Sequence, residues 1–70
     1  MNPFEHYRRR ANLTQKDVAD ILGLDQTTVS RWECGHKLPR ADRLLRISEL
    51  YHCSVDDLLK RAHDARSQSL

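Results

Sequence analysis

The sequence predicts an all-α fold, a compact domain of five short helices. Apolar residues recur at helical spacing, no segment alternates apolar and polar residues with period two, and two glycines and two prolines are too few for a β-sandwich. The chain has 70 residues and a mass of 8.2 kDa, which allows one small domain and no second core. We expect this domain to cover residues 1–63 and a polar tail to follow at residues 64–70.

The first helix is predicted by the residues at its two ends. Asn2 and Pro3 are typical of the N-cap and of the first helical position, and Glu5 can reach back toward the cap. The helix should run to about Ala11, because Asn12 can adopt the left-handed conformation that ends helices.

Capping residues and glycines also delimit the second and third helices. Thr14 and Asp17 have the spacing of a capping box, with Asp in place of the usual Glu, and Gly23 ends this helix. Asp25 is the expected N-cap of the third helix, which ends at Gly35. The residues expected to face the core from these two helices are Val18, Ala19, Leu22, Val29 and Trp32.

The fourth helix is predicted after Pro39, and Ser54 with Asp57 predicts the start of a fifth that ends near His63. In the fourth helix, the i, i+3, i+4, i+7 pattern is formed by Leu44, Ile47, Ser48 and Tyr51. The fifth helix contributes two further apolar residues, Leu58 and Leu59. Three apolar residues either complete the core or remain for a dimer surface, and both alternatives stay open for Leu45, Leu50 and Val55.

Charge and cysteine content restrict the possible ligands. The net charge of +2 arises within the first forty residues, which hold seven basic and five acidic side chains, whereas the other thirty residues hold five of each. An anionic partner should therefore meet the first part of the chain. Cys34 and Cys53 are nineteen residues apart, so with His36 and His52 they lack the paired spacing of a structural zinc site. We expect one buried thiol, one incidental thiol, no metal and no cofactor.

Several classes of protein are disfavoured by the motifs that the sequence lacks. No apolar run approaches the ~18 residues of a membrane span, and the first residues lack the basic and apolar regions of a signal peptide. No Gly-rich phosphate loop, H-E-x-x-H motif, G-x-S-x-G motif or carboxylate cluster indicates an enzyme. We therefore expect a cytoplasmic, non-enzymatic protein that has no membrane partner and no effector-binding domain.

The second and third helices have the connection expected of a helix-turn-helix. Only Leu24 separates Gly23 from Asp25, so the two helices must cross steeply. Ala19 is small enough for a close crossing, and Gly23 can adopt the positive φ of the turn. This arrangement predicts that one face of the third helix remains exposed.

The exposed face of the third helix should carry polar side chains suited to base edges. Gln26, Thr27, Ser30 and Arg31 form one continuous stripe without an acidic residue. Gln can bond bidentately to adenine, Arg can do so to guanine, and a Thr methyl can contact thymine. A merely solvated face would more often carry Glu and Lys. The stripe therefore favours major-groove readout of DNA.

The sequence resembles the Cro and phage-repressor-like helix-turn-helix proteins, also called XRE-type regulators, over residues 4–60. The resembling segments are Leu13-Thr14-Gln15-Lys16-Asp17-Val18-Ala19 through Gly23, then Thr28-Val29-Ser30-Arg31-Trp32-Glu33, then Gly35, Pro39 and Ser54-Val55-Asp56-Asp57-Leu58-Leu59. The resemblance implies a compact five-helix fold like that of lambda repressor. It also implies insertion of the third helix into the major groove of DNA.

The resemblance also implies roles for individual residues. Base contacts are implied for Gln26, Thr27, Ser30 and Arg31. Phosphate contacts are implied for Thr14, Gln15, Lys16, Thr28, Lys37 and Arg40. Arg8 and Glu33 match a pair that ties the first helix to the end of the third, whereas Cys34 departs from the polar or basic residue often found there.

Two hypotheses from different classes follow. The first is a transcriptional regulator that binds double-stranded DNA sequence-specifically and represses by occlusion. Because specific sites usually need two modules one helical turn apart, we expect a homodimer on a pseudo-palindromic operator. The alternative is an antitoxin or adaptor module whose main partner is another protein.

Overall fold

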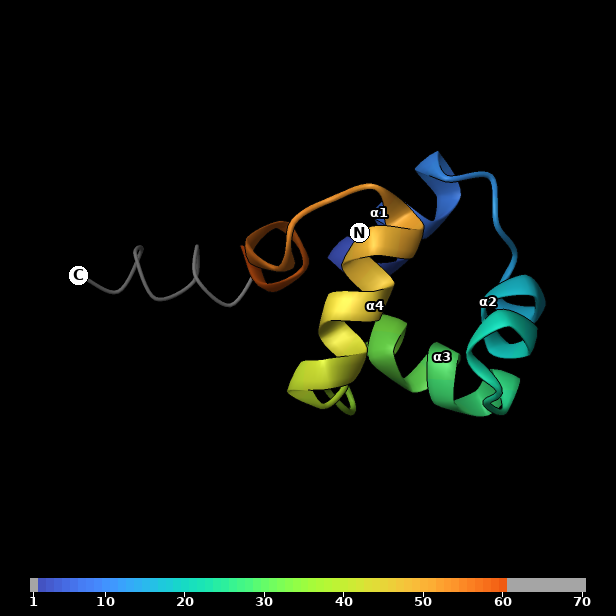
Figure 1. Cartoon of the computed structure of the whole chain (residues 1–70). Helices are drawn as coiled ribbons and strands as arrows, with labels where there is room; N and C mark the ends of the chain where they lie inside the picture. Colours follow the sequence, from blue (N-terminus) through green and yellow to red (C-terminus); the bar gives the residue numbers. More distant parts are fainter. Residues whose placement is uncertain (1, 61–70) are drawn as a thin grey trace.

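All regular structure in the described part of the chain, residues 2–60, is helical in the computed structural model (Figure 1). The helices are α1 (Pro3–Arg10), α2 (Gln15–Leu22), α3 (Gln26–Cys34) and α4 (Ala41–Tyr51), followed by a helical segment at residues 55–60. This confirms the predicted all-α class. The predicted end of the last helix near His63 and the tail at residues 64–70 lie outside the described residues.

The first two helices begin with the predicted caps. The Asn2 side chain accepts a hydrogen bond from the backbone N–H of Phe4 at 2.7 Å, and Asn12 ends the segment with φ of 60°. In α2, the Thr14 hydroxyl accepts from the Asp17 N–H at 3.0 Å, while the Asp17 carboxylate accepts from the Thr14 N–H at 2.9 Å. Both caps satisfy donors that a helix start would otherwise leave unpaired.

The turn between α2 and α3 depends on a left-handed residue at Gly23, whose φ is 70°. This conformation lets the Leu24 N–H donate to the Ala19 carbonyl at 2.8 Å, which closes the end of α2. Asp25 occupies the predicted N-cap position of α3, but its side chain makes no capping hydrogen bond. The direction of α3 is therefore fixed by the glycine turn and by packing.

The core lies where α2 packs across α3 and α1 packs against both α3 and α4. Val18 on α2 and Val29 on α3 are fully buried. Ala19, also buried, lies on α2, which packs closely against α3. Trp32 is 2% exposed and packs 6.3 Å from Phe4 between ring centroids, so it is a core residue. The other buried apolar residues of the cluster are Ile47, Tyr51 and Leu58.

The three apolar residues and the two cysteines whose burial the sequence left open differ in their exposure. Leu50 packs against the core and Val55 is half-buried, whereas Leu45 is 55% exposed. The expectation of one buried thiol was wrong, because Cys53 is only half-buried at the edge of the core and Cys34 is exposed. Burial nevertheless raises the pKa of the Cys53 thiol.

Among the helices of residues 2–60, none has the length and apolar character needed to cross a bilayer.

Replacing Ala19 by Leu should destabilise the fold, because the α2–α3 crossing leaves only 4% of this residue exposed. Overpacking of this kind costs about 1–3 kcal/mol, which urea denaturation would detect as a lower midpoint. Ala41→Leu, at the exposed start of α4, is the matched control and should change stability by no more than about 0.5 kcal/mol. Unchanged stability of Ala19→Leu would contradict the close crossing.

Stability should fall in acid because two capping carboxylates must be protonated. Hydrogen bonds from the backbone N–H groups of Thr14 and Ser54 lower the pKa values of Asp17 and Asp57 below their ordinary value of 3.8. A lowered folded-state pKa stabilises the fold above the unfolded value, and this stabilisation is lost as the pH falls through the folded value. We expect the melting temperature to drop below about pH 4.

The matched variant for the acid prediction is Asp17→Asn combined with Asp57→Asn. Its amide oxygens can accept the same hydrogen bonds but do not titrate. The variant should therefore lose less stability than the natural chain between pH 5 and pH 2. Equal losses in thermal melts of the two proteins would exclude the capping carboxylates as the source.

Candidate nucleic-acid interface

A nearly buried ion pair joins α1 to the end of α3. The Arg8 Nε donates to Glu33 Oε2 at 2.6 Å, and Arg8 Nη2 donates to Glu33 Oε1 at 3.1 Å. The side chains are 10% and 5% exposed. Arg8 Nη1 also donates to the Leu13 carbonyl at 2.8 Å, which holds the segment between α1 and α2 against the pair. The structure thus contains the α1–α3 pair that the family resemblance implies.

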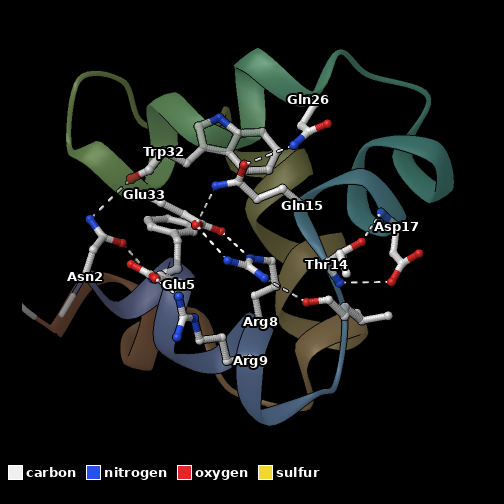
Figure 2. A network of polar contacts seen from close by, with 12 residues as sticks. Asn2, Glu5, Arg8, Arg9, Thr14, Gln15, Asp17, Gln26, Trp32 and Glu33 are labelled. Atoms are coloured by element: carbon white, nitrogen blue, oxygen red, sulfur yellow. Dashed lines mark hydrogen bonds and ion pairs between the residues drawn. The ribbon is translucent and has the colours of Figure 1, made fainter.

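The same carboxylate extends the contacts outward to the start of α2 and then to the start of α3 (Figure 2). Gln15 Nε2 donates to Glu33 Oε1 at 2.9 Å. Gln26 Nε2 in turn donates to Gln15 Oε1 at 3.4 Å. Because Gln26 and Glu33 are seven residues apart on one side of a helix, Gln15 lies alongside α3 and reaches both of its ends.

The predicted base-contacting residues lie on α3 with different exposures. Gln26, Thr27 and Arg31 are exposed, whereas Ser30 is half-buried. The spacing of α3 also places Cys34 on the outer face with Thr27 and Arg31, at i, i+4 and i+7. Cys34 is exposed there as a free thiol, at the position where the family resemblance implies a polar or basic residue.

Five of the six predicted phosphate-contacting residues fall into two groups, at the start of α2 and before α4, and Thr28 lies on α3. Thr14, Gln15 and Lys16 lie at the N-terminus of α2, where the Thr14 hydroxyl already caps the helix. Lys37 and Arg40 are both exposed and precede α4, whose N-cap position is Arg40. Thr28, for which a phosphate contact is also expected, is half-buried on α3.

The basic side chains differ in how strongly their own neighbours hold them. Lys16 is paired with Asp20 at 3.0 Å, and this hydrogen bond raises the pKa of the exposed Lys16 ammonium. Exposed i,i+4 pairs are weak, so the pair can open when another anion approaches. Arg31, Lys37 and Arg40 are exposed, and none of the three forms an ion pair within the described residues.

The basic run on α1 is divided among three environments. Arg8 is buried against Glu33, and the hydrogen bond to that carboxylate raises the Arg8 pKa further. Arg9 pairs with Glu5 at 2.7 Å, and the guanidinium of Arg10 lies 5.6 Å from the centre of the Tyr7 ring. Only Arg8 is therefore buried in the core, whereas Arg9 and Arg10 are exposed and contact residues of their own helix.

Tyr51 completes the surroundings of the ion pair from α4. Burial raises the pKa of its phenol well above the ordinary value, so Tyr51 stays neutral and adds no charge near Glu33. Asn2 provides a second link from α1 to α3, because its Nδ2 donates to the Trp32 carbonyl at 3.2 Å. The Asn2 hydrogen bond and the Arg8–Glu33 pair thus both join α1 to the C-terminal half of α3.

Replacing Arg8 by Met should be strongly destabilising, because Glu33 would keep its charge in a nearly buried position without a cation. Breaking one partner of such a pair costs about 3–5 kcal/mol, measurable by urea denaturation or by loss of folding at 25 °C. The double variant Arg8→Met, Glu33→Met removes both charges and should be more stable than the single variant. The opposite order of stability would contradict a buried, mutually dependent pair.

Comparisons with known proteins identify sequence relatives of this chain. The helix-turn-helix family model matches residues 5–58. The HTH-type transcriptional regulator ImmR of Bacillus subtilis is 38% identical over 52 residues, which cover 74% of this chain and 41% of the relative. The cryptic phage CTXphi transcriptional repressor RstR of Vibrio cholerae is 32% identical over 63 residues, covering 90% and 56%.

A third relative is named an activator, whereas RstR is named a repressor. The HTH-type transcriptional activator BcrR of Enterococcus faecalis is 34% identical over 55 residues, covering 79% of this chain and 27% of the relative. The chain thus spans between 27% and 56% of the length of these three relatives. No solved structure matches it significantly. On the family match, the chain belongs to the Cro and phage-repressor-like, XRE-type helix-turn-helix family.

Proposed function

We propose that this chain binds double-stranded DNA sequence-specifically and regulates transcription, with α3 in the major groove. The observation that carries the proposal is the exposed, acid-free face of α3, which lies beside the N-terminus of α2. An α-helix fits the major groove, and phosphates are favoured at helix N-termini. The names of the relatives, all transcriptional regulators, support the same conclusion.

Base recognition is assigned to the stripe of α3. Gln26 presents an amide that can bond two atoms of adenine, and Arg31 presents two parallel donors for guanine O6 and N7. Thr27 offers a methyl group to thymine, and Ser30, half-buried, offers a hydroxyl to a nearby edge. Arg31 is the residue that we expect to contribute most to specificity, because a bidentate Arg–guanine contact is the commonest specific one.

Phosphate contacts are assigned to both ends of the face. At one end are the N–H groups of the first turn of α2, with Thr14, Gln15 and Lys16. At the other end are Lys37 and Arg40 before α4, and the hydroxyl of Thr28 provides a further donor. Contacts of this kind position the protein on the duplex without reading its sequence.

We further propose that two copies bind a pseudo-palindromic operator one helical turn apart and repress by occluding the promoter. One helix in one groove reads too short a site to be specific alone. Occlusion requires only that the protein occupies the operator, and we expect it to do so in the cytoplasm. Apolar surface that a second copy could cover is present at Ile21, Leu38 and Leu45, each at least half exposed.

Selection of binding sites from a random duplex library, repeated at two salt concentrations, tests the proposal. We expect enrichment of an inverted repeat whose half-site centres are about 34–36 Å apart. Weak, salt-sensitive retention without enrichment would contradict sequence-specific recognition. It would favour the alternative function, an antitoxin or adaptor that uses the exposed leucines and Ile21 to bind another protein.

Arg31→Ala and Arg40→Ala should weaken binding in different ways. Arg31→Ala should cost about 1–3 kcal/mol and relax the preference at one base pair. Arg40→Ala should weaken binding about equally on every sequence and reduce the slope of log affinity against log salt by about 1. Equal losses on all sequences for Arg31→Ala would contradict base reading, and an unchanged slope for Arg40→Ala would contradict its phosphate contact.

A further inference from the structure

The side-chain amide of Asn2 makes two hydrogen bonds, one to its own helix and one to the end of α3. Its Oδ1 accepts from the Phe4 N–H at 2.7 Å, and its Nδ2 donates to the Trp32 carbonyl at 3.2 Å (Figure 2). We call these two bonds the Asn2 bridge. We infer that Asn2 is a positioning residue for DNA recognition, because the bridge fixes the last turn of α3, which carries Arg31. The inference rests on the proposed function, since it concerns how Arg31 reads a base.

The two bonds of the bridge together require an amide at position 2. The Phe4 N–H needs an acceptor and the Trp32 carbonyl needs a donor, and an amide group carries both. Rotating the amide by half a turn would set its oxygen against the Trp32 carbonyl, so its orientation is not interchangeable. An Asp carboxylate of the same size would still cap α1, but it has no hydrogen to donate to that carbonyl.

The bridge closes the last turn of α3 together with the backbone. The His36 N–H donates to the Arg31 carbonyl at 3.0 Å, and the Gly35 N–H donates to the Trp32 carbonyl at 3.3 Å. Because a carbonyl oxygen has two lone pairs, Trp32 can accept from Gly35 and Asn2 together. Carbonyls at a helix end have no intrahelical partners of their own. Asn2 therefore joins the start of α1 to the residue that follows Arg31.

The two ends of α3 are held by different contacts. At its start, Asp25 makes no side-chain cap, so the preceding turn and packing set its position. At its end, the buried ion pair holds a side chain of the last turn, whereas the Asn2 bridge holds the backbone. Loss of the bridge should therefore shift the end that carries Arg31 and leave Gln26, at the other end, in place.

The test compares base preference at two positions of the selected operator. Arg31→Ala and Gln26→Ala identify the base pair that each residue reads, as the pair at which preference is lost. Asn2→Asp and Asn2→Ser keep an acceptor for the cap of α1 but lose the NH₂ group, and both are titrated against duplexes that differ at one pair or the other. Asn12→Asp is the matched control, because it makes the same change at an exposed position after α1.

We expect both Asn2 variants to reduce discrimination at the Arg31 base pair by at least about threefold, part of what a bidentate contact supplies. Discrimination at the Gln26 base pair should be unchanged. The added charge of Asn2→Asp weakens binding to every duplex alike, so it changes neither ratio. A variant that was merely less stable would likewise lose affinity equally on all duplexes. The Asn12→Asp control should keep both ratios.

Hydrogen exchange in the absence of DNA measures the bridge itself. In Asn2→Asp, the N–H groups of Gly35 and His36 should exchange at least about threefold faster, because the turn that they close opens more often. The Leu24 N–H, which closes the end of α2, should exchange at its natural rate. Unchanged exchange at Gly35 and His36 would contradict the bridge.

Natural ratios at the Arg31 base pair in both folded Asn2 variants would overturn the inference while leaving the proposed function intact. Equal losses at the Arg31 and Gln26 base pairs would overturn it as well. Thermal melts establish that each variant is folded, and Asn2→Ser, with a preferred N-cap residue and no added charge, decides the question if Asn2→Asp does not fold. If Arg31→Ala loses no base preference, the inference fails, and if the natural chain selects no sequence, the proposed function fails with it.

Discussion

The guanidinium of Arg8 and the carboxylate of Glu33 lie almost entirely out of water, and each compensates the burial of the other. Two such charges are tolerated only when they are paired and their other hydrogen bonds are satisfied, which the Leu13 carbonyl and Gln15 provide. The pair therefore requires that α1, the start of α2 and the end of α3 occupy one relative position. The exposed face of α3 depends on that position for its direction.

The other ion pairs of residues 2–60 do not impose such a constraint. Arg9–Glu5 and Lys16–Asp20 each join residues of the same helix and have at least one largely exposed partner, so each is worth about 0–1 kcal/mol. The buried pair instead joins residues 25 positions apart in the chain. Its carboxylate also accepts a hydrogen bond from Gln15 at the start of α2, so it joins three helices. Substitutions there should consequently be examined for effects on folding before any effect on DNA binding is interpreted.

Much of the fold could be predicted because its signals are local. The caps at Asn2 and Thr14 and the turn at Gly23 each involve residues within a few positions of one another. Contacts across the chain could not be obtained this way. No spacing rule links Gln15 with Glu33, so their hydrogen bond was not expected, and only a family resemblance implied the Arg8–Glu33 pair. The burial of each thiol was likewise decided by packing.

A crystal structure of the protein bound to the duplex that it selects would test most directly whether α3 is the DNA-reading helix. We expect α3 to lie in the major groove with the Gln26 and Arg31 side chains on base edges. A duplex bound to another face of the domain would contradict the assignment of the interface.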